Sequence, residues 1–191
     1  MNLRKLIVVA LSAIVALSGN ALYSEVARAQ PGNNRRTFAD WCRQKADLSP
    51  ETKHTVEVLL EEAGTNDCDA GDRKLSSLTE LDLSEKQISD IKPLASLTNL
   101  TKLFLINNQI SDIKPLASLT NLTKLWLEEN QISDIKPLAS LTNLTKLWLE
   151  ENQISDIKPL ASLTNLTELF LINNQISDIK PLASLTNLTE L

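Results

Sequence analysis

From Leu75 onward the chain repeats itself every 22 residues, and this periodicity constrains the fold more than any other feature of the sequence. Each copy carries the spacing L-x-x-L-x-L-x-x-N-x-I, except that Lys86 takes the asparagine position in the first copy. A fixed period of this length indicates stacked coils that contact only their neighbours. The complete copies are 75–96, 97–118, 119–140, 141–162 and 163–184, and a sixth, incomplete copy covers 185–191.

The middle of each copy predicts a short strand with one buried face. Leu103 and Leu105 alternate with other residue types, which is the period of a strand. Identical segments one repeat apart stack as parallel strands about 4.8 Å from one another. The asparagines then fall in a column, where each amide can satisfy turn backbone groups that would otherwise be buried without partners. The members of this asparagine ladder are Asn108, Asn130, Asn152 and Asn174.

The second half of each copy returns apolar side chains to the interior, as Ile110, Ile113 and Leu116 do. The proline on this path, Pro115 in this copy, is expected to keep the return path extended before a short turn. The sequence therefore predicts a right-handed α/β solenoid. A parallel sheet lines its concave side, and short 3-10 turns lie on its convex side.

This pattern, with Q-I-S-D-I-x-P-L in every copy, resembles the bacterial internalin-type class of leucine-rich repeat proteins. The resemblance covers residues 75–191 together with a small helical cap before them. It implies an exported or surface-exposed protein that binds another macromolecule on the concave strand face. Neither a surface anchor nor a sorting signal follows the repeats, so attachment to a cell wall is not expected.

Residues 1–29 have the three parts of a secretory signal peptide: a basic start, an apolar run over 6–17 and an A-x-A site that ends at Ala29. The apolar run is shorter than the roughly 20 residues of a bilayer span. An uncleaved anchor or a buried core helix is the alternative. We expect residues 30–36 to be a linker and the protein to be secreted, periplasmic or at the cell surface, with no membrane insertion after cleavage.

Residues 37–74 are predicted to form a helical cap that covers the apolar end of the first coil. Thr37 and Asp40 favour the start of a short helix. Ser49, followed by proline and glutamate, favours the start of a second helix that ends near Gly64.

The chain has two cysteines and one histidine, which leaves little material for a metal site or a catalytic triad. In an exported chain, Cys42 and Cys68 are expected to form a disulfide. It would close a loop of about 27 residues and contribute on the order of 3 kcal/mol. Metal ligation would need companion ligands, and a redox pair usually has C-x-x-C spacing. His54 is expected to be a solvated helix residue, so no catalytic residue, metal or cofactor is predicted.

The repeats differ from one another in few places. Between residues 97 and 184 only four of the 22 columns vary, and all four lie in or beside the strand. Three of them point away from the core by alternation. The core and the convex face are constant, so the variation indicates a ligand-binding surface on the concave face. The columns are Lys102/Lys124/Lys146/Glu168, Phe104/Trp126/Trp148/Phe170, Ile106/Glu128/Glu150/Ile172 and Asn107/Glu129/Glu151/Asn173.

The aromatic column is expected to form an exposed row about 14 Å long, with lysines on one flank and glutamates on the other. Exposed aromatic residues beside charged ones are typical of a recognition surface. Neighbouring glutamates about 5 Å apart repel by roughly 1 kcal/mol, which stability alone would not favour. The alternative is that aromatic residues help the strands to pair and that duplication copied the charges passively.

Two further patterns have structural interpretations. The N-L-T triplets, such as the one at Asn99, match a glycosylation acceptor but are interpreted as a by-product of the repeat. Asp112 and its equivalents occur once per coil, too sparsely for a calcium ladder, and are expected to cap turns.

The formal net charge of −5 and the pI near 5.0 argue against nucleic acid or an anionic membrane as partner. The sequence predicts a non-enzymatic protein that binds a protein or peptide ligand. A glycan is the second candidate, because sugar rings stack on tryptophan. The third is a truncated remnant of a longer repeat protein with no independent function. The incomplete last coil would present an apolar end, for which truncation of the chain is the favoured explanation; end-to-end self-association and coverage by a partner are the alternatives.

Overall fold

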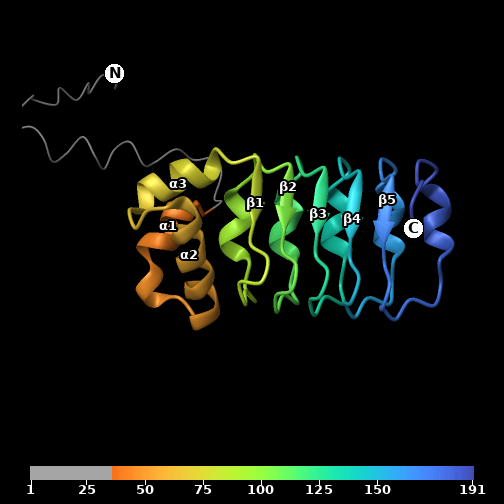
Figure 1. The fold of residues 1–191 in the computed structure, drawn as a ribbon, viewed down its shortest axis with the longest axis horizontal. Helices are drawn as coiled ribbons and strands as arrows, with labels where there is room; N and C mark the ends of the chain where they lie inside the picture. Colours follow the sequence, from red (N-terminus) through yellow and green to blue (C-terminus); the bar gives the residue numbers. More distant parts are fainter. Residues whose placement is uncertain (1–35) are drawn as a thin grey trace, which may run out of the picture. The chain divides into compact units, whose positions relative to one another are not determined.

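The computed structural model describes residues 36–191, in which three helices lead into a row of short strands and 3-10 helices (Figure 1). The predicted signal peptide at 1–29 and most of the predicted linker lie outside the described residues. Of the helices in 36–191, none combines the length and the hydropathy that a bilayer span requires.

The first helix, α1 (Phe38–Arg43), begins where its capping residues predict. The Thr37 hydroxyl accepts a hydrogen bond from the backbone N–H of Asp40, and the Asp40 carboxylate accepts one from the backbone N–H of Thr37. This backbone hydrogen bond holds the pKa of the Asp40 carboxyl below its ordinary value. A short 3-10 helix, η2 (Lys45–Asp47), follows.

The second helix, α2 (Pro50–Ala63), starts after Ser49 and ends at Gly64, as predicted. Gly64 has a φ of 67°, the left-handed conformation that glycine adopts without strain. The third helix, α3 (Cys68–Ser76), was not predicted, although Asp67 caps its start by accepting a hydrogen bond from Ala70.

A disulfide between Cys42 and Cys68 joins α1 to the start of α3. The same two helices pack closely at Gly71, where a Cβ atom would lie 3.1 Å from the Phe38 ring. The cap is therefore a three-helix unit tied together by one covalent bond and one close helix approach.

Five short strands form one parallel sheet in which each strand pairs with the next along the chain. The register aligns residues one repeat apart, so that Phe104 lies opposite Trp126. A single bridge between Glu168 and Glu190 begins a sixth coil. The strands are β1 (Glu80–Asp82), β2 (Lys102–Phe104), β3 (Lys124–Trp126), β4 (Lys146–Trp148) and β5 (Glu168–Phe170).

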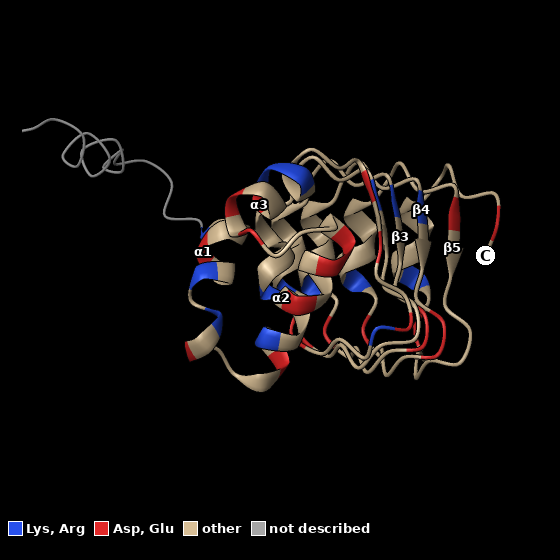
Figure 2. Cartoon of the chain, turned by 60° about the vertical axis from the view of Figure 1, so that its left-hand side comes forward, with Lys and Arg blue, Asp and Glu red and all other residues tan. Residues whose placement is uncertain are grey.

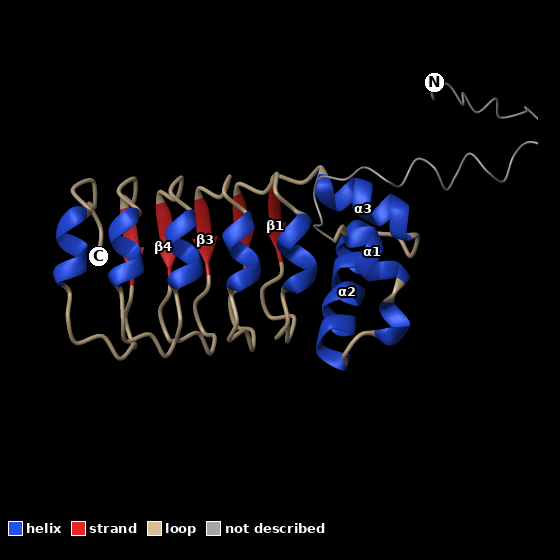
Figure 3. Ribbon diagram, turned by 180° about the vertical axis from the view of Figure 1, so that it is seen from behind, coloured by secondary structure: helices blue, strands red, loops and turns tan. Residues whose placement is uncertain are grey.

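A 3-10 helix lies on the convex side of each complete coil, and in the view of Figure 3 these helices stand in front of the sheet. The prediction that proline keeps this return path extended is wrong, because each proline is the second residue of a 3-10 helix. Proline has no N–H to leave unpaired, and its fixed φ suits a first helical turn. The helices are η3 (Lys92–Ser96), η4 (Lys114–Ser118), η5 (Lys136–Ser140), η6 (Lys158–Ser162) and η7 (Lys180–Ser184).

Leucine and isoleucine side chains fill the space between the sheet and the 3-10 helices. Leu103, Leu105, Ile110 and Leu116 are fully buried, and so are their equivalents in the next two coils. In the last complete coil the burial decreases: Ile179 is 66% exposed, whereas the equivalent Ile157 is 1% exposed. The solenoid predicted from the repeat is confirmed.

The asparagine ladder bridges consecutive coils. Asn130 Nδ2 donates to Leu105 O at 2.9 Å, and its Oδ1 accepts from Ile110 N at 3.0 Å. Asn108 and Asn152 have the same pattern and are 7% exposed, like Asn130, while Asn174 is half-buried.

Other columns of polar side chains also form hydrogen bonds to the backbone, either within a coil or to the preceding coil. Asp112 Oδ1 accepts from Lys114 N at 3.0 Å and so caps the turn that leads into the 3-10 helix, as predicted. The asparagine of each N-L-T triplet also has a structural role that the sequence interpretation missed. Asn121 Nδ2, for example, donates to Thr98 O of the preceding coil at 2.9 Å.

The cap contacts the first coil through polar groups of α2. The expectation that His54 is a solvated residue is wrong: it is half-buried, and its Nε2 lies 2.7 Å from Lys86 O. Thr55 Oγ1 donates to Asp90 O at 2.7 Å, and Lys86 Nζ lies 3.1 Å from a Glu62 carboxylate oxygen. Lys86, which interrupts the asparagine column, is therefore an anchor for the cap.

Candidate binding surface

The strands place the variable columns on the face opposite the buried leucines. In each of β2 to β5 the central leucine is buried and the residues on either side are half-buried. The variable residues therefore face outward on the strands and in the segment that follows them. We call this set the strand-face strip, and its members are Lys102, Phe104, Ile106, Lys124, Trp126, Glu128, Glu129, Lys146, Trp148, Glu150, Glu151, Glu168, Phe170 and Ile172.

The four aromatic rings of the strip stack on one another along the row of strands. Ring centroids are 4.0 Å apart between Phe104 and Trp126, 4.6 Å between Trp126 and Trp148, and 5.7 Å between Trp148 and Phe170. The interplanar angles are 13°, 8° and 15°. Each indole face is thus covered by a neighbouring ring, and the stack offers ring edges to solvent. Sequence alternation predicted the row but not this stacking.

The column on one side of the aromatic stack contains paired and unpaired lysines. Lys102 Nζ lies 2.8 Å from a Glu80 carboxylate oxygen, and Lys146 pairs with Glu168. Among residues 36–191, Lys124 in the middle has no ion-pair partner. Within residues 36–191, the predicted lysine flank therefore presents one lysine without an ion-pair partner, Lys124 on β3.

The column on the other side carries two half-buried carboxyl groups in the central coils. The Oε2 atoms of Glu128 and Glu150 are buried and have no hydrogen-bond partner in the described structure. Burial is the main cause that raises the pKa of Glu128 to about 7, and the charges of Glu150 and Glu129 raise it further. In the outer coils this column holds isoleucine: Ile106 is half-buried, whereas Ile172 is 65% exposed.

The last variable column lies at a turn with unusual backbone geometry. Asn107, Glu129, Glu151 and Asn173 have φ values of 50°, 54°, 53° and 58°. Asparagine tolerates this left-handed conformation better than other residues with side chains, whereas glutamate is strained in it. The alternation of asparagine and glutamate was visible in the sequence, but the backbone conformation was not. The central coils therefore combine acidic side chains with local strain.

The charges on this face are separated in space. Figure 2 shows lysine on β3 and β4 and acidic residues in the loops that follow the strands. In the part of the chain that the structure describes, none of the four glutamates of the central coils forms an ion pair. The strip is therefore an apolar ridge with a small cationic side and a larger, uncompensated anionic side.

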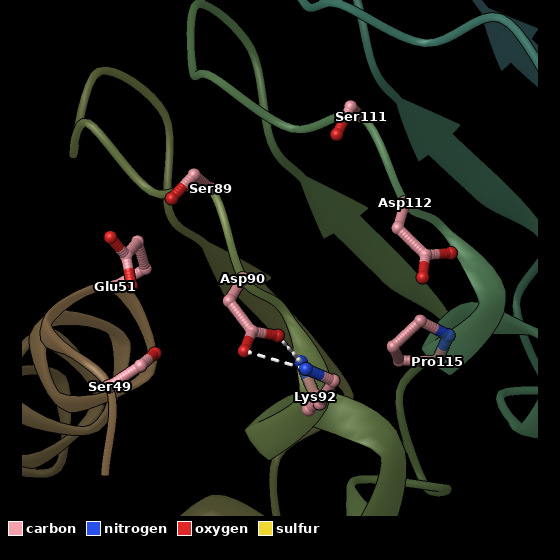
Figure 4. A pocket seen from close by; sticks show the side chains of 8 residues that line it. All are labelled: Ser49, Glu51, Ser89, Asp90, Lys92, Ser111, Asp112 and Pro115. Carbon is pink, nitrogen blue, oxygen red and sulfur yellow. Dashed lines mark hydrogen bonds and ion pairs between the residues drawn. The ribbon is translucent and has the colours of Figure 1, made fainter.

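A hollow between α2 and the first two coils is the other candidate site (Figure 4). Asp90 accepts hydrogen bonds from Thr52 Oγ1 at 2.5 Å and from Lys92 N at 3.0 Å. Although burial raises it, these hydrogen bonds hold the pKa of Asp90 below its ordinary value. The hydrogen bonds of Asp90 thus connect the cap to the first coil. The hollow is lined by Ser49, Glu51, Ser89, Asp90, Lys92, Ser111, Asp112 and Pro115.

Within 36–191, no three histidine, cysteine, aspartate or glutamate side chains come together in a way that could hold a metal ion.

Comparison with known proteins identifies the repeats. The family model described as leucine-rich repeats (two copies) matches residues 76–118 and 120–162. No curated protein sequence matches the chain.

Several solved structures are similar to the chain. Internalin C2 from Listeria monocytogenes is 52% identical over 63% of this chain and 55% of its own, with a TM-score of 0.60. An internalin, InlF, from the same species is 37% identical over 77% of this chain and 44% of its own, with a TM-score of 0.69. A leucine-rich repeat protein from Leptospira interrogans is 32% identical over 62% of this chain and 31% of its own, with a TM-score of 0.58. The chain thus spans 55% or less of the length of each of these proteins.

Proposed function

This chain is a leucine-rich repeat protein of the bacterial internalin type, and on that premise we propose that it binds a protein or peptide ligand non-covalently through the strand-face strip. The binding involves no covalent step and takes place outside the cytoplasm. The proposed export is supported by the signal-like segment at 1–29 and by the disulfide between Cys42 and Cys68, since such bonds persist in oxidising compartments.

The observation that carries the proposal is the aromatic stack, which lies among the four columns in which the copies between residues 97 and 184 vary. Trp126 and Trp148 belong to two identical central coils, flanked by phenylalanine in the outer coils. The buried leucines and the convex 3-10 helices need no variation to keep the fold. Tryptophan edges provide apolar contact area at little loss of side-chain entropy, which is why tryptophan is frequent at the centre of protein interfaces.

The geometry favours a polypeptide over a glycan. A sugar ring stacks on an open aromatic face, whereas both faces of Trp126 are covered by Phe104 and Trp148 at 4.0 and 4.6 Å. A polypeptide can instead lay apolar side chains along the ring edges and place charged groups on either side.

The test is Trp126→Ala/Trp148→Ala in the full chain, used as bait in envelope extract. We expect the retention of a cognate ligand to fall at least tenfold, because two central interface tryptophans commonly contribute more than 1 kcal/mol each. Circular dichroism would show that the solenoid remains folded.

The matched control is Lys136→Ala/Lys158→Ala. These lysines lie in the same two coils but on the convex 3-10 helices, and both are exposed. Retention should be unchanged in this variant. If the folded tryptophan variant retained the same ligand as well as wild type does, the strip would not be the binding surface.

A further inference from the structure

We propose that the ligand presents an amphipathic α-helix, which lies along the row of rings with acidic side chains toward Lys124 and basic side chains toward Glu129 and Glu151. This proposal rests on the proposed function, because it specifies which kind of polypeptide the strand-face strip binds. The spacing of the rings, the pairing of the strand backbone and the separation of the charges all favour this partner.

The rings recur at nearly the spacing of helical turns. Ring centroids are 4.0, 4.6 and 5.7 Å apart along the stack. A helix that lies along this row advances about 4.5 Å over three residues and about 6 Å over four, so apolar side chains at i, i+3, i+4 and i+7 place roughly one contact on each coil. Side chains on one face of an extended chain are about 6.6 Å apart, so they lose register with the rings within a few coils.

Within residues 36–191, the middle strands have no free edge with which an extended ligand could pair. Strand β3 pairs with β2 on one side and with β4 on the other. The ladder continues past the strands, where Leu105 N donates to Trp126 O at 3.0 Å and Leu127 N donates to Trp148 O at 2.9 Å. An extended ligand on this face would have to leave its own N–H and C=O groups to water. A helix pairs these groups internally, so its apolar side can exclude water from the rings.

The two charged columns are about one helix diameter apart. Lys124 precedes Trp126 by two residues and Glu128 follows it by two. Four residues of extended chain correspond to about 13 Å. An α-helix with its side chains is about 10–12 Å across. A helix that rests on the rings therefore reaches both columns with the residues on its two flanks.

The charges on the two sides are opposite in sign and are not compensated by ion pairs. Among residues 36–191, Lys124 forms no ion pair, and neither do the exposed Glu129 and Glu151. A helix with one acidic and one basic flank complements both sides in one orientation, whereas the reversed orientation brings like charges together. Such complementarity orients a partner more than it adds affinity.

The experiment selects random octadecapeptides displayed on phage against the full chain. Peptides that fail to bind Trp126→Ala/Trp148→Ala are retained. One of them is synthesised with a ¹³C label, and its Cα chemical shifts are measured free and bound. Its Kd is measured by calorimetry, and so is the Kd of a variant peptide that carries proline at a central position outside its apolar stripe.

The charge arrangement is tested by measuring the same peptide with Lys124→Glu and Lys158→Glu. Lys158 is exposed on the convex helix η6 and forms no ion pair within residues 36–191. Its substitution therefore makes the same change in charge at a matched lysine outside the strip.

We expect the Cα shifts of the bound peptide to take helical values and its apolar residues to recur at i, i+3, i+4 and i+7. The proline variant should bind at least about tenfold more weakly, because proline disrupts a helix interior. Lys124→Glu should weaken binding about fivefold and Lys158→Glu less than about twofold.

A tryptophan-dependent peptide that binds in an extended form, or that tolerates the central proline, would overturn the inference and leave the proposed function in place. Equal effects of Lys124→Glu and Lys158→Glu would also overturn it, because the flanks of the helix would then not read the charges of the strip. If selection yields no tryptophan-dependent peptide, the proposed function fails together with the inference.

Discussion

At the scale of single residues, the central coils differ from the outer coils by substitutions that do not improve folding. Position 107 and its equivalents adopt a left-handed backbone; the coils on either side of the central pair place asparagine there, at Asn107 and Asn173, and the first coil places Glu85. The central coils place glutamate in the same conformation, at Glu129 and Glu151. Strained residues are often retained at binding sites, and both of these lie within the strand-face strip.

Replacing Glu129 and Glu151 by asparagine is expected to stabilise the protein. The change relieves left-handed strain of about 0.5–1 kcal/mol per site, which corresponds to a few degrees in Tm for a domain of this size. Thermal unfolding followed by circular dichroism measures the change. Glu129→Gln/Glu151→Gln removes the same charges without favouring the left-handed backbone. If that control stabilises as much as asparagine does, charge repulsion and not backbone strain explains the gain.

The raised pKa of Glu128 predicts a pH-dependent stability. The folded protein binds this proton up to about pH 7, whereas the unfolded chain releases it near 4.5. The unfolded state therefore carries fewer protons between these values, and the stability contributed by the neutral carboxyl is lost as the pH rises from 4.5 to 7. Glu128→Gln is expected to raise the free energy of unfolding by about 1 kcal/mol at pH 8, after allowance for solvent screening, and to have little effect at pH 4.

Urea unfolding of wild type and Glu128→Gln at both pH values checks this difference. A stabilisation of equal size at pH 4 and pH 8 would mean that the carboxyl is not neutralised by its surroundings.

At the scale of elements, short strands of three residues are held in register by side-chain columns between coils. Asn130→Ala leaves the N–H of Ile110 without a partner in the interior and removes one of the two amide donors to the carbonyl of Leu105, which keeps that of Asn108. We expect a loss of about 2–4 kcal/mol in the free energy of unfolding, measured with urea. Asn143→Ala removes one exposed bond to Thr120 O and should lose less than about 1 kcal/mol. Similar losses for the two variants would contradict a special role of the buried ladder.

Most elements follow from local patterns in the sequence. The strands, the starts of α1 and α2 and the outward columns were predictable, because alternation, capping residues and Gly64 act within a few residues. Helix α3 was missed because it has few apolar residues to mark a buried face: of its nine positions only Gly71 and Leu75 are buried. Its stability depends on contacts with α1, which are distant in sequence.

The candidate site was predictable only in outline. Comparing the copies located the variable columns, and alternation placed them on one face. Three features depend on side-chain packing between coils and were not predictable. They are the contact of each ring with the next, the ion pairs that Lys102 and Lys146 form with glutamates, and the Oε2 atoms without hydrogen-bond partners in the described structure. Likewise, His54 was assigned to solvent because its partner, a carbonyl of Lys86, lies 32 residues away.

At the scale of the whole described unit, the stability of each coil depends on the coils next to it, since each coil contacts only its neighbours. The helical cap covers one end of this array and is closed by the disulfide between Cys42 and Cys68. In the chain-entropy model, this bond contributes about 3 kcal/mol.

Cys42→Ala/Cys68→Ala is therefore expected to lower Tm by several degrees, and reduction of the wild type should have the same effect. Hydrogen exchange should become faster in β1 than in β3, because loss of the cap exposes the first coil before the central ones. A reducing agent should leave the Tm of the double variant unchanged, because this variant has no disulfide to reduce. Uniform acceleration across all strands would show that the cap is not a local end cover.

The most direct measurement of the central claim is a ligand titration followed through the indole N–H signals in a ¹⁵N–¹H correlation spectrum. The chain has three tryptophans, two in the strip and one, Trp41, in α1. The captured ligand or a selected peptide should shift or broaden the signals of Trp126 and Trp148 and leave that of Trp41 in place. A shift confined to Trp41, with both strip indoles unaffected at saturation, would contradict binding on the strand face.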